Sequence, residues 1–265
     1  MSATKATGRS VKDIAPDRLA RLNSGEAEAT TLTECLAVDF AALLANVLPE
    51  IGADAVAEMQ RAGAAGISRR MPLAARLIDE KFGLSIMERL SRHSSDTVRG
   101  WAGFMIGAAG MEFDDRLAAI RPFADDPHFG VREWAWMAVR PHLAAELEVA
   151  IALLTEWTTD RSERVRRFAT EAIRPRGVWC AHIAALKQQP ELALPVLEPL
   201  RADPAIYVQD SVGNWLNDAG KDRPDWVQSL CNRWLVESPH PATGRICRRG
   251  LRSILSDKQR IGSRK

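Results

Sequence analysis

The stretch DPHFGVREWAWMAVRP, residues 126–141, decides the fold because its pattern recurs along the chain. It has an Asp, a short turn, and then a Val followed by Arg or Gln that opens an apolar helix. Similar stretches start at Asp96, Asp160 and Asp203, and a weaker one starts at His240. Their anchor residues, separated by 33, 34, 43 and 38 positions, are Val98, Val131, Val165, Val208 and Ile246.

A second helical pattern lies between successive anchors. LAAELEVAIALLTEWT, residues 143–158, is one example, with apolar residues at spacings of three and four. A two-helix unit that recurs at this interval is typical of α-solenoids of the HEAT or armadillo type. We therefore predict an all-α fold, in which HEAT-like helical hairpins stack into a curved superhelix with a concave face.

Each repeat has a predicted capping residue and a predicted buried seam. The leading Asp is expected to serve as N-cap or turn residue before the second helix. The positions four and eight after the anchor are apolar in three copies, which predicts that they form the core seam: Ala135, Val139, Ala169, Ile173, Val212 and Leu216.

The repeat signal divides the chain into four predicted segments. Residues 96–255 hold the clear repeats and are expected to form the functional domain. Residues 31–95 show helical patterns with a faint repeat, which predicts a helical cap of degenerate repeats. Residues 1–30 are predicted to be partly irregular, and residues 256–265 form a basic tail that we expect to be solvated and disordered.

The charge is distributed unevenly along the chain. The net charge is +2, but residues 1–130 hold 15 basic and 18 acidic residues, whereas residues 131–265 hold 21 and 16. A basic half favours a polyanionic partner, with nucleic acid as the first candidate. For the helical pattern from Arg245 to Arg252, a solvated charged face is an equally good interpretation.

Other classes of protein have little support in the sequence. The four cysteines lie far apart without a CxxC pair, which indicates free thiols in a reducing compartment rather than disulfides. The histidines form no metal-binding motif, so we expect no metal and no cofactor. Neither a signal peptide nor a membrane span is predicted. We expect a monomeric cytoplasmic protein that associates with the nucleoid through DNA and not with membranes.

Three carboxylates take related positions in adjacent repeats. Glu133, Glu171 and Asp218 follow their anchors by two, six and ten positions, and steps of four keep a helical residue on one face. We therefore expect them to line the same concave surface. Arginines recur nearby, after the anchors and before prolines: Arg132, Arg166, Arg140 and Arg174. Such a groove suits a substrate that is anionic overall but has a cationic reacting centre.

Three segments resemble one known family. DPHFGVREWAWMAVRPH, VRRFATEAIRPRGVWCAHI and YVQDSVGNWLNDAGKDRPDWV resemble the AlkC branch of the HEAT-like-repeat DNA glycosylases, relatives of AlkD. The resemblance is good over residues 90–255 and loose over the N-terminal third. It implies a monofunctional enzyme of base-excision repair that binds duplex DNA in its concave face and hydrolyses the N-glycosidic bond of alkylated purines, chiefly 3-methyladenine. Some members have a further immunoglobulin-like domain; here we expect its DNA contact to be absent or replaced by the basic tail.

The resemblance also implies roles for particular residues, namely Glu133, Glu171, Trp179 and Asp218. An alkylated purine is cationic and leaves readily, so carboxylates are needed mainly to stabilise an oxocarbenium-like sugar and to direct water. Trp179 and Trp136 are predicted to contact the substrate, with a cation–π attraction of about 0.5–2 kcal/mol. The predicted contacts to DNA phosphates are Arg132, Arg166, Arg167, Arg174, Lys221 and Arg248.

Each assignment has a simpler alternative. Glu133 fits an ordinary surface position near a helix N-terminus. Glu171 can pair with Arg167 along its own helix, Asp218 can be a turn residue, and Trp136 can pack beneath Glu133. The alternative function is a non-catalytic HEAT-repeat scaffold that binds DNA or protein through the same face. A passive DNA binder should gain affinity when the acids are removed, whereas a glycosylase should lose turnover.

Overall fold

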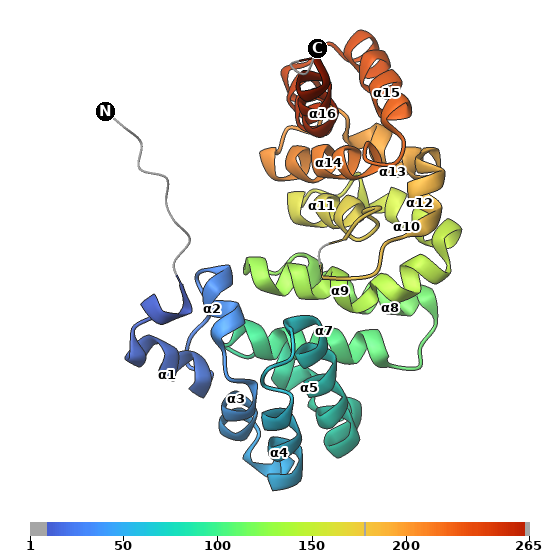
Figure 1. The fold of residues 1–265 in the computed structure, drawn as a ribbon. Helices are drawn as coiled ribbons and strands as arrows, with labels where there is room; N and C mark the ends of the chain where they lie inside the picture. The colour runs from blue at the N-terminus through green and yellow to red at the C-terminus, as the bar shows by residue number, and fades with distance from the viewer. Residues whose placement is uncertain (1–9, 178, 263–265) are drawn as a thin grey trace. The chain divides into compact units, whose positions relative to one another are not determined.

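The repeat sequences fold as helices throughout the part of the chain that the structure describes. The computed structural model describes residues 10–177 and 179–262, with side chains as far as residue 255. In these ranges every regular element is a helix, and the predicted all-α HEAT-like repeat fold is confirmed (Figure 1). The chain forms two compact units, Met1–Glu112 with Asp126–Ala138, and Phe113–Asp125 with Val139–Lys265.

The first unit contains the N-terminal helices and the first clear repeat helix. Its elements are η1 Val11–Asp13, α1 Pro16–Ser24, α2 Leu32–Ala37, α3 Phe40–Val47, η2 Pro49–Ile51, α4 Ala53–Arg61, α5 Ile67–Phe82, η3 Gly83–Ile86, α6 Met87–Ser91 and α7 Asp96–Ala108. The boundary between the units falls within α9, Phe129–Ala145.

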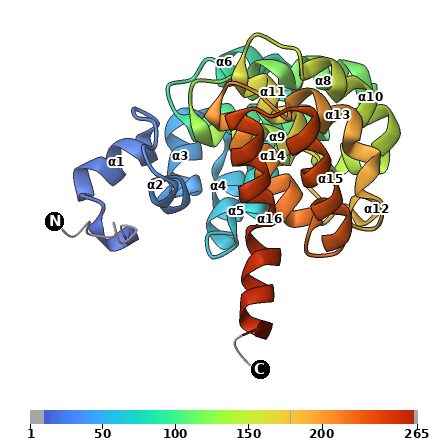
Figure 2. The ribbon, with the colours of Figure 1, turned by 90° about the horizontal axis from the view of Figure 1, so that it is seen from above.

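The second unit contains the remaining repeats. Its elements are α8 Phe113–Ala124, α10 Leu147–Trp157, α11 Glu163–Glu171, α12 Ala184–Gln188, η4 Pro190–Ala193, α13 Leu194–Leu197, η5 Glu198–Leu200, α14 Ile206–Ala219, α15 Pro224–Glu237 and α16 Pro241–Gly262. The last helix continues through part of the basic tail, and the side chains of residues 256–265 lie outside the described part. Figure 2 shows α16 extending past α14 and α15.

The predicted seam forms the core of the repeats. All six predicted positions are buried, and the largest fully buried side chains of the described residues are tryptophans and a phenylalanine: Trp101, Trp134, Phe168, Trp215 and Trp234. In the second unit, α14 and α16 pack closely at two glycines. A Cβ added to Gly213 would lie 2.8 Å from the Cβ of Arg249, and a Cβ added to Gly250 would lie 2.8 Å from the Cβ of Leu216. The glycines therefore set the distance between α14 and α16.

The leading Asp forms a turn rather than an N-cap in three of the repeats. The carboxylates of Asp126, Asp160 and Asp203 accept hydrogen bonds from the backbone N–H groups two residues further on, at 2.7, 2.8 and 2.8 Å. The N-cap of α11 is Ser162, so the N-cap alternative for the leading Asp is wrong at this helix. The Asp instead closes an Asx turn that precedes the helix.

Two of the arginines that follow an anchor, Arg99 and Arg166, connect consecutive repeats within a unit. In the first unit, Arg99 donates to the Asp126 carboxylate and to the carbonyl oxygens of its own turn. In the second unit, Arg166 donates to Asp203 at 2.7 and 3.0 Å and to the carbonyls of Asp160 and Arg161. We call these two connections the Asp–Arg ladder. They explain why Arg follows Val in the repeat.

Replacing a ladder arginine should destabilise its unit. Arg166→Gln removes an ion pair with the buried Asp203, and we expect the free energy of unfolding to fall by about 2 kcal/mol. The matched control is Arg164→Gln on the same helix, whose ion pair with Asp125 is long, at 3.8 Å, and about 40% exposed, and we expect it to cost less than about 0.5 kcal/mol. Urea unfolding measures both; equal losses would contradict a ladder role for Arg166.

Candidate active site

Glu133 is a half-buried carboxylate on the first turns of α9, in the first unit. The indole N–H of Trp136 donates to its Oε2 at 2.8 Å, from three residues further along the helix. Trp136 is only 3% exposed. This burial corrects the prediction that Trp136 stacks on a substrate, because its ring is covered by protein. It packs beneath Glu133 and orients the carboxylate.

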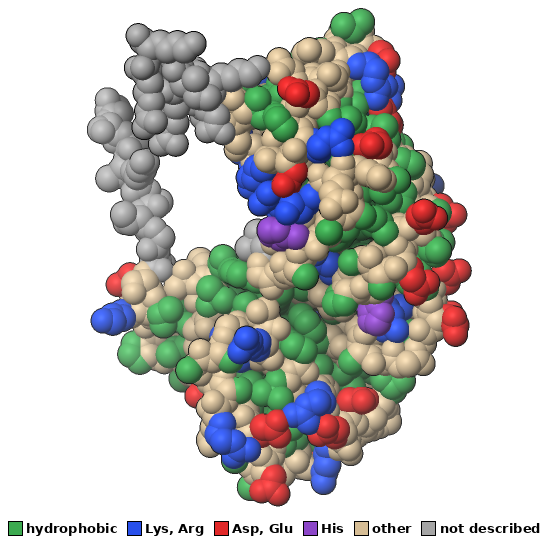
Figure 3. Space-filling view, turned by 45° about the vertical axis from the view of Figure 1, so that its right-hand side comes forward, with side chains coloured by type: hydrophobic (Ala, Val, Ile, Leu, Met, Phe, Trp, Pro, Cys, Tyr) green, Lys and Arg blue, Asp and Glu red, His purple; other side chains and the backbone are tan. Residues whose placement is uncertain are grey.

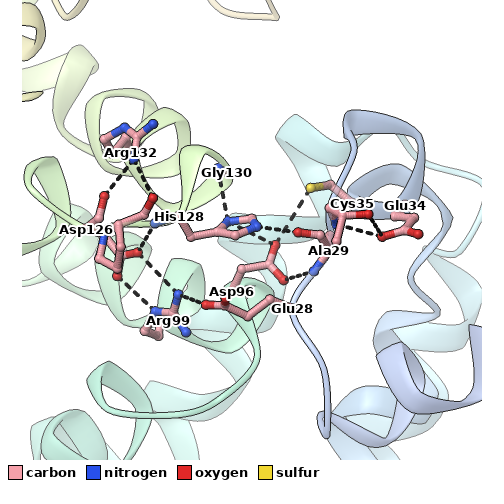
Figure 4. Close-up of polar contacts among 12 residues, drawn as sticks. Glu28, Ala29, Glu34, Cys35, Asp96, Arg99, Asp126, His128, Gly130 and Arg132 are labelled. Carbon is pink, nitrogen blue, oxygen red and sulfur yellow. Dashed lines mark hydrogen bonds and ion pairs between the residues drawn. The ribbon is translucent and has the colours of Figure 1, made fainter. Parts of the chain in front are cut away.

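A polar network holds the start of α9 within the first unit (Figure 4). The His128 ring contacts the carbonyl of Ala29 through Nε2 at 2.5 Å and accepts from the Gly130 N–H through Nδ1 at 3.1 Å. Asp96 accepts from the Ala29 N–H at 2.9 Å and lies near the Cys35 thiol. Burial raises the pKa of the Cys35 thiol, so the thiol stays protonated. The network therefore fixes the helix end from which Glu133 projects.

Glu171 and Asp218 come together in the second unit, on either side of Arg174. Arg174 donates through Nη1 to Glu171 at 2.7 Å, and through Nε and Nη2 to Asp218 at 2.9 and 2.7 Å. Ser211 donates to the second oxygen of Glu171 at 2.7 Å. We call Glu171, Arg174, Asp218 and Ser211 the carboxylate cluster.

The charge state of the carboxylate cluster follows from its contacts. Burial alone would raise the pKa of Glu171, but the positive charges of Arg167 and Arg174 and the hydrogen bond from Ser211 outweigh it and hold this pKa below its usual range. Both carboxylates are buried, at 4% and 3% exposure. Glu171 is therefore an ionised group whose oxygens accept from the protein, and Asp218 is buried against Arg174 in the same way.

Trp179 lies at the surface of the second unit, as the sequence predicts. It is 45% exposed, and its backbone φ of 60° places it in the left-handed region that a side chain as large as tryptophan rarely adopts. It belongs to the segment that follows α11, residues 172–177 and 179–183, which we call the Trp179 loop. An exposed ring in this setting is available to a ligand.

The predicted phosphate-binding arginines have partners inside the protein. Arg132 donates to the carbonyls of Asp126 and Pro127, and Arg166 belongs to the Asp–Arg ladder. Their recurrence in the sequence is thus explained by the turns, and it no longer supports a role at phosphates. Arg174 is half-buried in the carboxylate cluster, which corrects its prediction as a phosphate contact because its donors are taken by carboxylates.

The other three predicted phosphate contacts, Arg167, Lys221 and Arg248, differ in how exposed they are. Arg167 lies over the Tyr207 ring at 4.6 Å and within 3.6 Å of Glu171. Lys221 and Arg248 are exposed, and Lys221 also pairs with Asp218 at 3.3 Å. Figure 3 shows the basic side chains on the face drawn interleaved with acidic ones. The phosphate contacts of Lys221 and Arg248 stay predictions.

Glu133 belongs to the first unit, whereas Glu171 and Asp218 belong to the second. The expectation that three carboxylates share one surface therefore stays a prediction. One residue was missed by the sequence reasoning, Ser211, which has no distinctive pattern. Arg140 was noticed only as a recurring Arg-Pro pair, shared with Arg174, and was given no role of its own.

Other kinds of site have no support in the described ranges. No helix there is long and apolar enough to cross a membrane. No three His, Cys, Asp or Glu side chains among the residues described are grouped so that they would hold a metal ion. The cysteines are free thiols.

Two family profiles and one curated protein match parts of this chain. A profile described as DNA alkylation repair enzyme matches residues 130–242, and a profile of HEAT repeats matches residues 84–174. An uncharacterized Bacillus subtilis protein, YhaZ, is 40% identical over 126 residues, which is 47% of this chain and 35% of that protein. The chain thus spans about a third of this curated relative.

Solved structures extend the similarity over most of the chain. The Pseudomonas fluorescens alkylpurine DNA glycosylase AlkC, bound to DNA containing an abasic site analog, matches with a TM-score of 0.66 and 26% identity over 94% of this chain and 66% of its own. The smu.31 protein of Streptococcus mutans matches with a TM-score of 0.52 and 22% identity over 77% of this chain and 90% of its own, which shows the fold alone.

Proposed function

Because the chain belongs to the AlkC/AlkD-type family of HEAT-like-repeat proteins, we propose that it is a DNA glycosylase that acts in DNA alkylation repair. Its substrate is duplex DNA containing alkylated purines of the 3-methyladenine class. The match with AlkC, which covers 94% of this chain, supports the general activity. A cytoplasmic enzyme in contact with the nucleoid would meet this substrate directly.

The observation on which the proposal rests is the geometry of Glu133. A group that directs water must have a fixed orientation and must be within reach of the substrate. Glu133 is half-buried and held by the indole of a buried tryptophan at 2.8 Å. It is therefore a better general base than Glu171 or Asp218, which are buried against Arg174.

The reaction needs little from the protein beyond positioning and charge. The bond between C1′ of the deoxyribose and the purine nitrogen breaks, and its electron pair neutralises the cationic base. The oxygen of water bonds to C1′, and Glu133 accepts the proton that the water loses. A carboxylate near C1′ also stabilises the positive charge that develops on the sugar. No cofactor takes part.

Trp179 and the exposed cations have supporting roles in the proposal. The exposed Trp179 ring stacks on the damaged nucleotide, where cation–π attraction favours an alkylated base. Lys221 and Arg248 contact phosphates. The carboxylate cluster holds α11 and α14 together and supplies Glu171 and Asp218 as fixed negative charges that favour a cationic transition state.

The test is release of free base from methylated duplex DNA. We expect the purified protein to release 3-methyladenine faster than the spontaneous loss measured in a parallel reaction without protein. Undamaged DNA should release no base, and the strand should remain uncut until the abasic site is treated with alkali. Binding of methylated DNA without release of 3-methyladenine or 7-methylguanine would contradict the proposal for these lesions.

The carboxylate cluster also supports a second candidate, a non-catalytic HEAT-repeat scaffold that binds DNA or protein. Buried carboxylates with full sets of donors are what a purely structural ion-pair network contains. A DNA-binding scaffold should bind DNA more tightly after Glu133→Gln, because a negative charge is removed, and should release no base. Release by the wild-type protein separates the two functions.

A further inference from the structure

Arg140 is a buried cation whose hydrogen bonds within the described chain all go to backbone carbonyls. It is 2% exposed. Its Nη1 donates to the carbonyl of Ala172 at 2.8 Å and its Nη2 to that of Arg174 at 2.6 Å. Nε and Nη2 both donate to the carbonyl of Ala181, at 3.2 and 3.1 Å. One guanidinium thus joins the end of α11 to the far side of the Trp179 loop.

The loop is shaped to fit this guanidinium. A Cβ on Gly177 would lie 3.1 Å from Cζ and 3.2 Å from Nε of Arg140, and 2.2 Å from the sulfur of Cys180. Only a residue without a side chain allows this approach. The ends of the loop are also joined, because the N–H of Ile183 donates to the carbonyl of Pro175 at 3.1 Å.

Trp179 needs such support because its backbone conformation is unfavourable. A residue with a Cβ is less stable in the left-handed region than in the right-handed one, because the Cβ comes too close to the following carbonyl oxygen. A strained residue persists only where surrounding contacts determine its conformation. The four hydrogen bonds of Arg140 supply these contacts on both sides of Trp179, at Ala172, Arg174 and Ala181.

We propose that Arg140 is a positioning residue that fixes the Trp179 loop for substrate binding, together with the backbone of Arg174. This inference rests on the proposed glycosylase function. Arg140 touches no substrate; it acts through the loop. Its contact with the Arg174 carbonyl joins Trp179 to the carboxylate cluster, so the same guanidinium sets where both lie in the second unit.

Lysine cannot replace arginine in this role. The guanidinium is a planar fork with five N–H donors at fixed angles, which reach three carbonyls lying in different directions. The ammonium group of lysine is a single point with three donors. Arg140→Lys therefore keeps the positive charge and removes the simultaneous contacts, which separates geometry from electrostatics.

The experiment compares wild type, Arg140→Lys and Gly177→Ala by two measurements. The first is amide hydrogen exchange of residues 176–177 and 179–183, which does not depend on activity. The second is the single-turnover rate of 3-methyladenine release. We expect both variants to exchange faster in the loop and to release base about 10- to 100-fold more slowly. Arg201→Lys, the same substitution at a half-buried ion pair with Glu198 that lies outside the Trp179 loop, should change neither quantity.

A double-mutant cycle distinguishes positioning from a general loss of structure. If Arg140 acts through Trp179, then Arg140→Lys should slow release much less in a Trp179→Ala background than in wild type. Slower release with unchanged loop exchange would overturn the proposal, and so would faster exchange with an unchanged rate or additive effects in the cycle. If wild type released no base, the proposed function and the role in substrate binding would both fail, while the exchange data would still decide whether Arg140 fixes the loop.

Discussion

Glu133→Gln is expected to slow 3-methyladenine release by about 10²- to 10⁴-fold in single-turnover reactions, which is the usual effect of removing a general base. The amide has nearly the same shape and keeps an oxygen that can accept from Trp136, so the helix should be unaffected. It cannot take a proton from water or supply a negative charge. Affinity for DNA containing an abasic site analog should stay the same or rise, because one acidic charge is lost.

The control for this experiment is Glu112→Gln, the same substitution at an exposed position of the first unit, which should leave the rate unchanged. Trp136→Phe removes the indole donor beneath Glu133, together with part of a buried ring, and should slow release less than Glu133→Gln does. If Glu133→Gln released base at the wild-type rate, another group would have to direct the water, and Asp218 would be tested next as Asp218→Asn.

Glu171→Gln should cost the protein about 3 kcal/mol of unfolding free energy at pH 7, because it removes one charge from a buried ion-pair network. Arg167 and Arg174 then face a neutral amide. The pKa of Glu171 is lower in the folded protein than in the unfolded chain, so its ionisation stabilises the fold. This contribution is complete above the unfolded pKa and disappears as the pH falls through the folded pKa.

The lowered pKa of Glu171 predicts how the effect of Glu171→Gln on stability depends on pH. The difference in stability between wild type and Glu171→Gln should be constant from pH 7 to about pH 5.5 and should shrink below pH 4.5, the ordinary pKa of a glutamate carboxyl. Urea unfolding at a series of pH values measures it. Glu163→Gln, at the exposed start of the same helix, is the matched control and should change stability little. A difference that grew as the pH fell would contradict the assigned charge state.

The fold could be predicted because each repeat is recognised from residues that lie close together in the sequence. The apolar positions, the Val near the start of each helix, and the turn aspartates Asp126, Asp160 and Asp203 depend only on local spacing and appear where expected. Asp96 instead lies within α7 and accepts from the Ala29 N–H. The N-cap alternative failed at α11 because a serine stands between the leading Asp and the helix and accepts from a backbone N–H of its first turn. Ser162 caps the helix, while Asp160 closes the turn before it.

The site was less predictable because long side chains point in directions that spacing does not show. The sequence placed Arg166 beside Val165, but its partner Asp203 lies 37 residues further on. Helical spacing put Trp136 near Glu133 without showing that the ring is covered. Arg140 satisfies carbonyls in a loop that has no repeat pattern, so only the recurring Arg-Pro pair hinted at it.

The Asp–Arg ladder has a consequence for how such a chain can acquire new chemistry. The contact between Arg166 and Asp203 sets the register of two neighbouring repeats, whatever the length of the segment between them. The longest interval between anchors, 43 residues from Val165 to Val208, is the one that contains Trp179. An insertion there lengthens a loop without shifting the helices on either side. Repeats joined in this way can therefore evolve a binding loop in one position while every other repeat keeps its own structure.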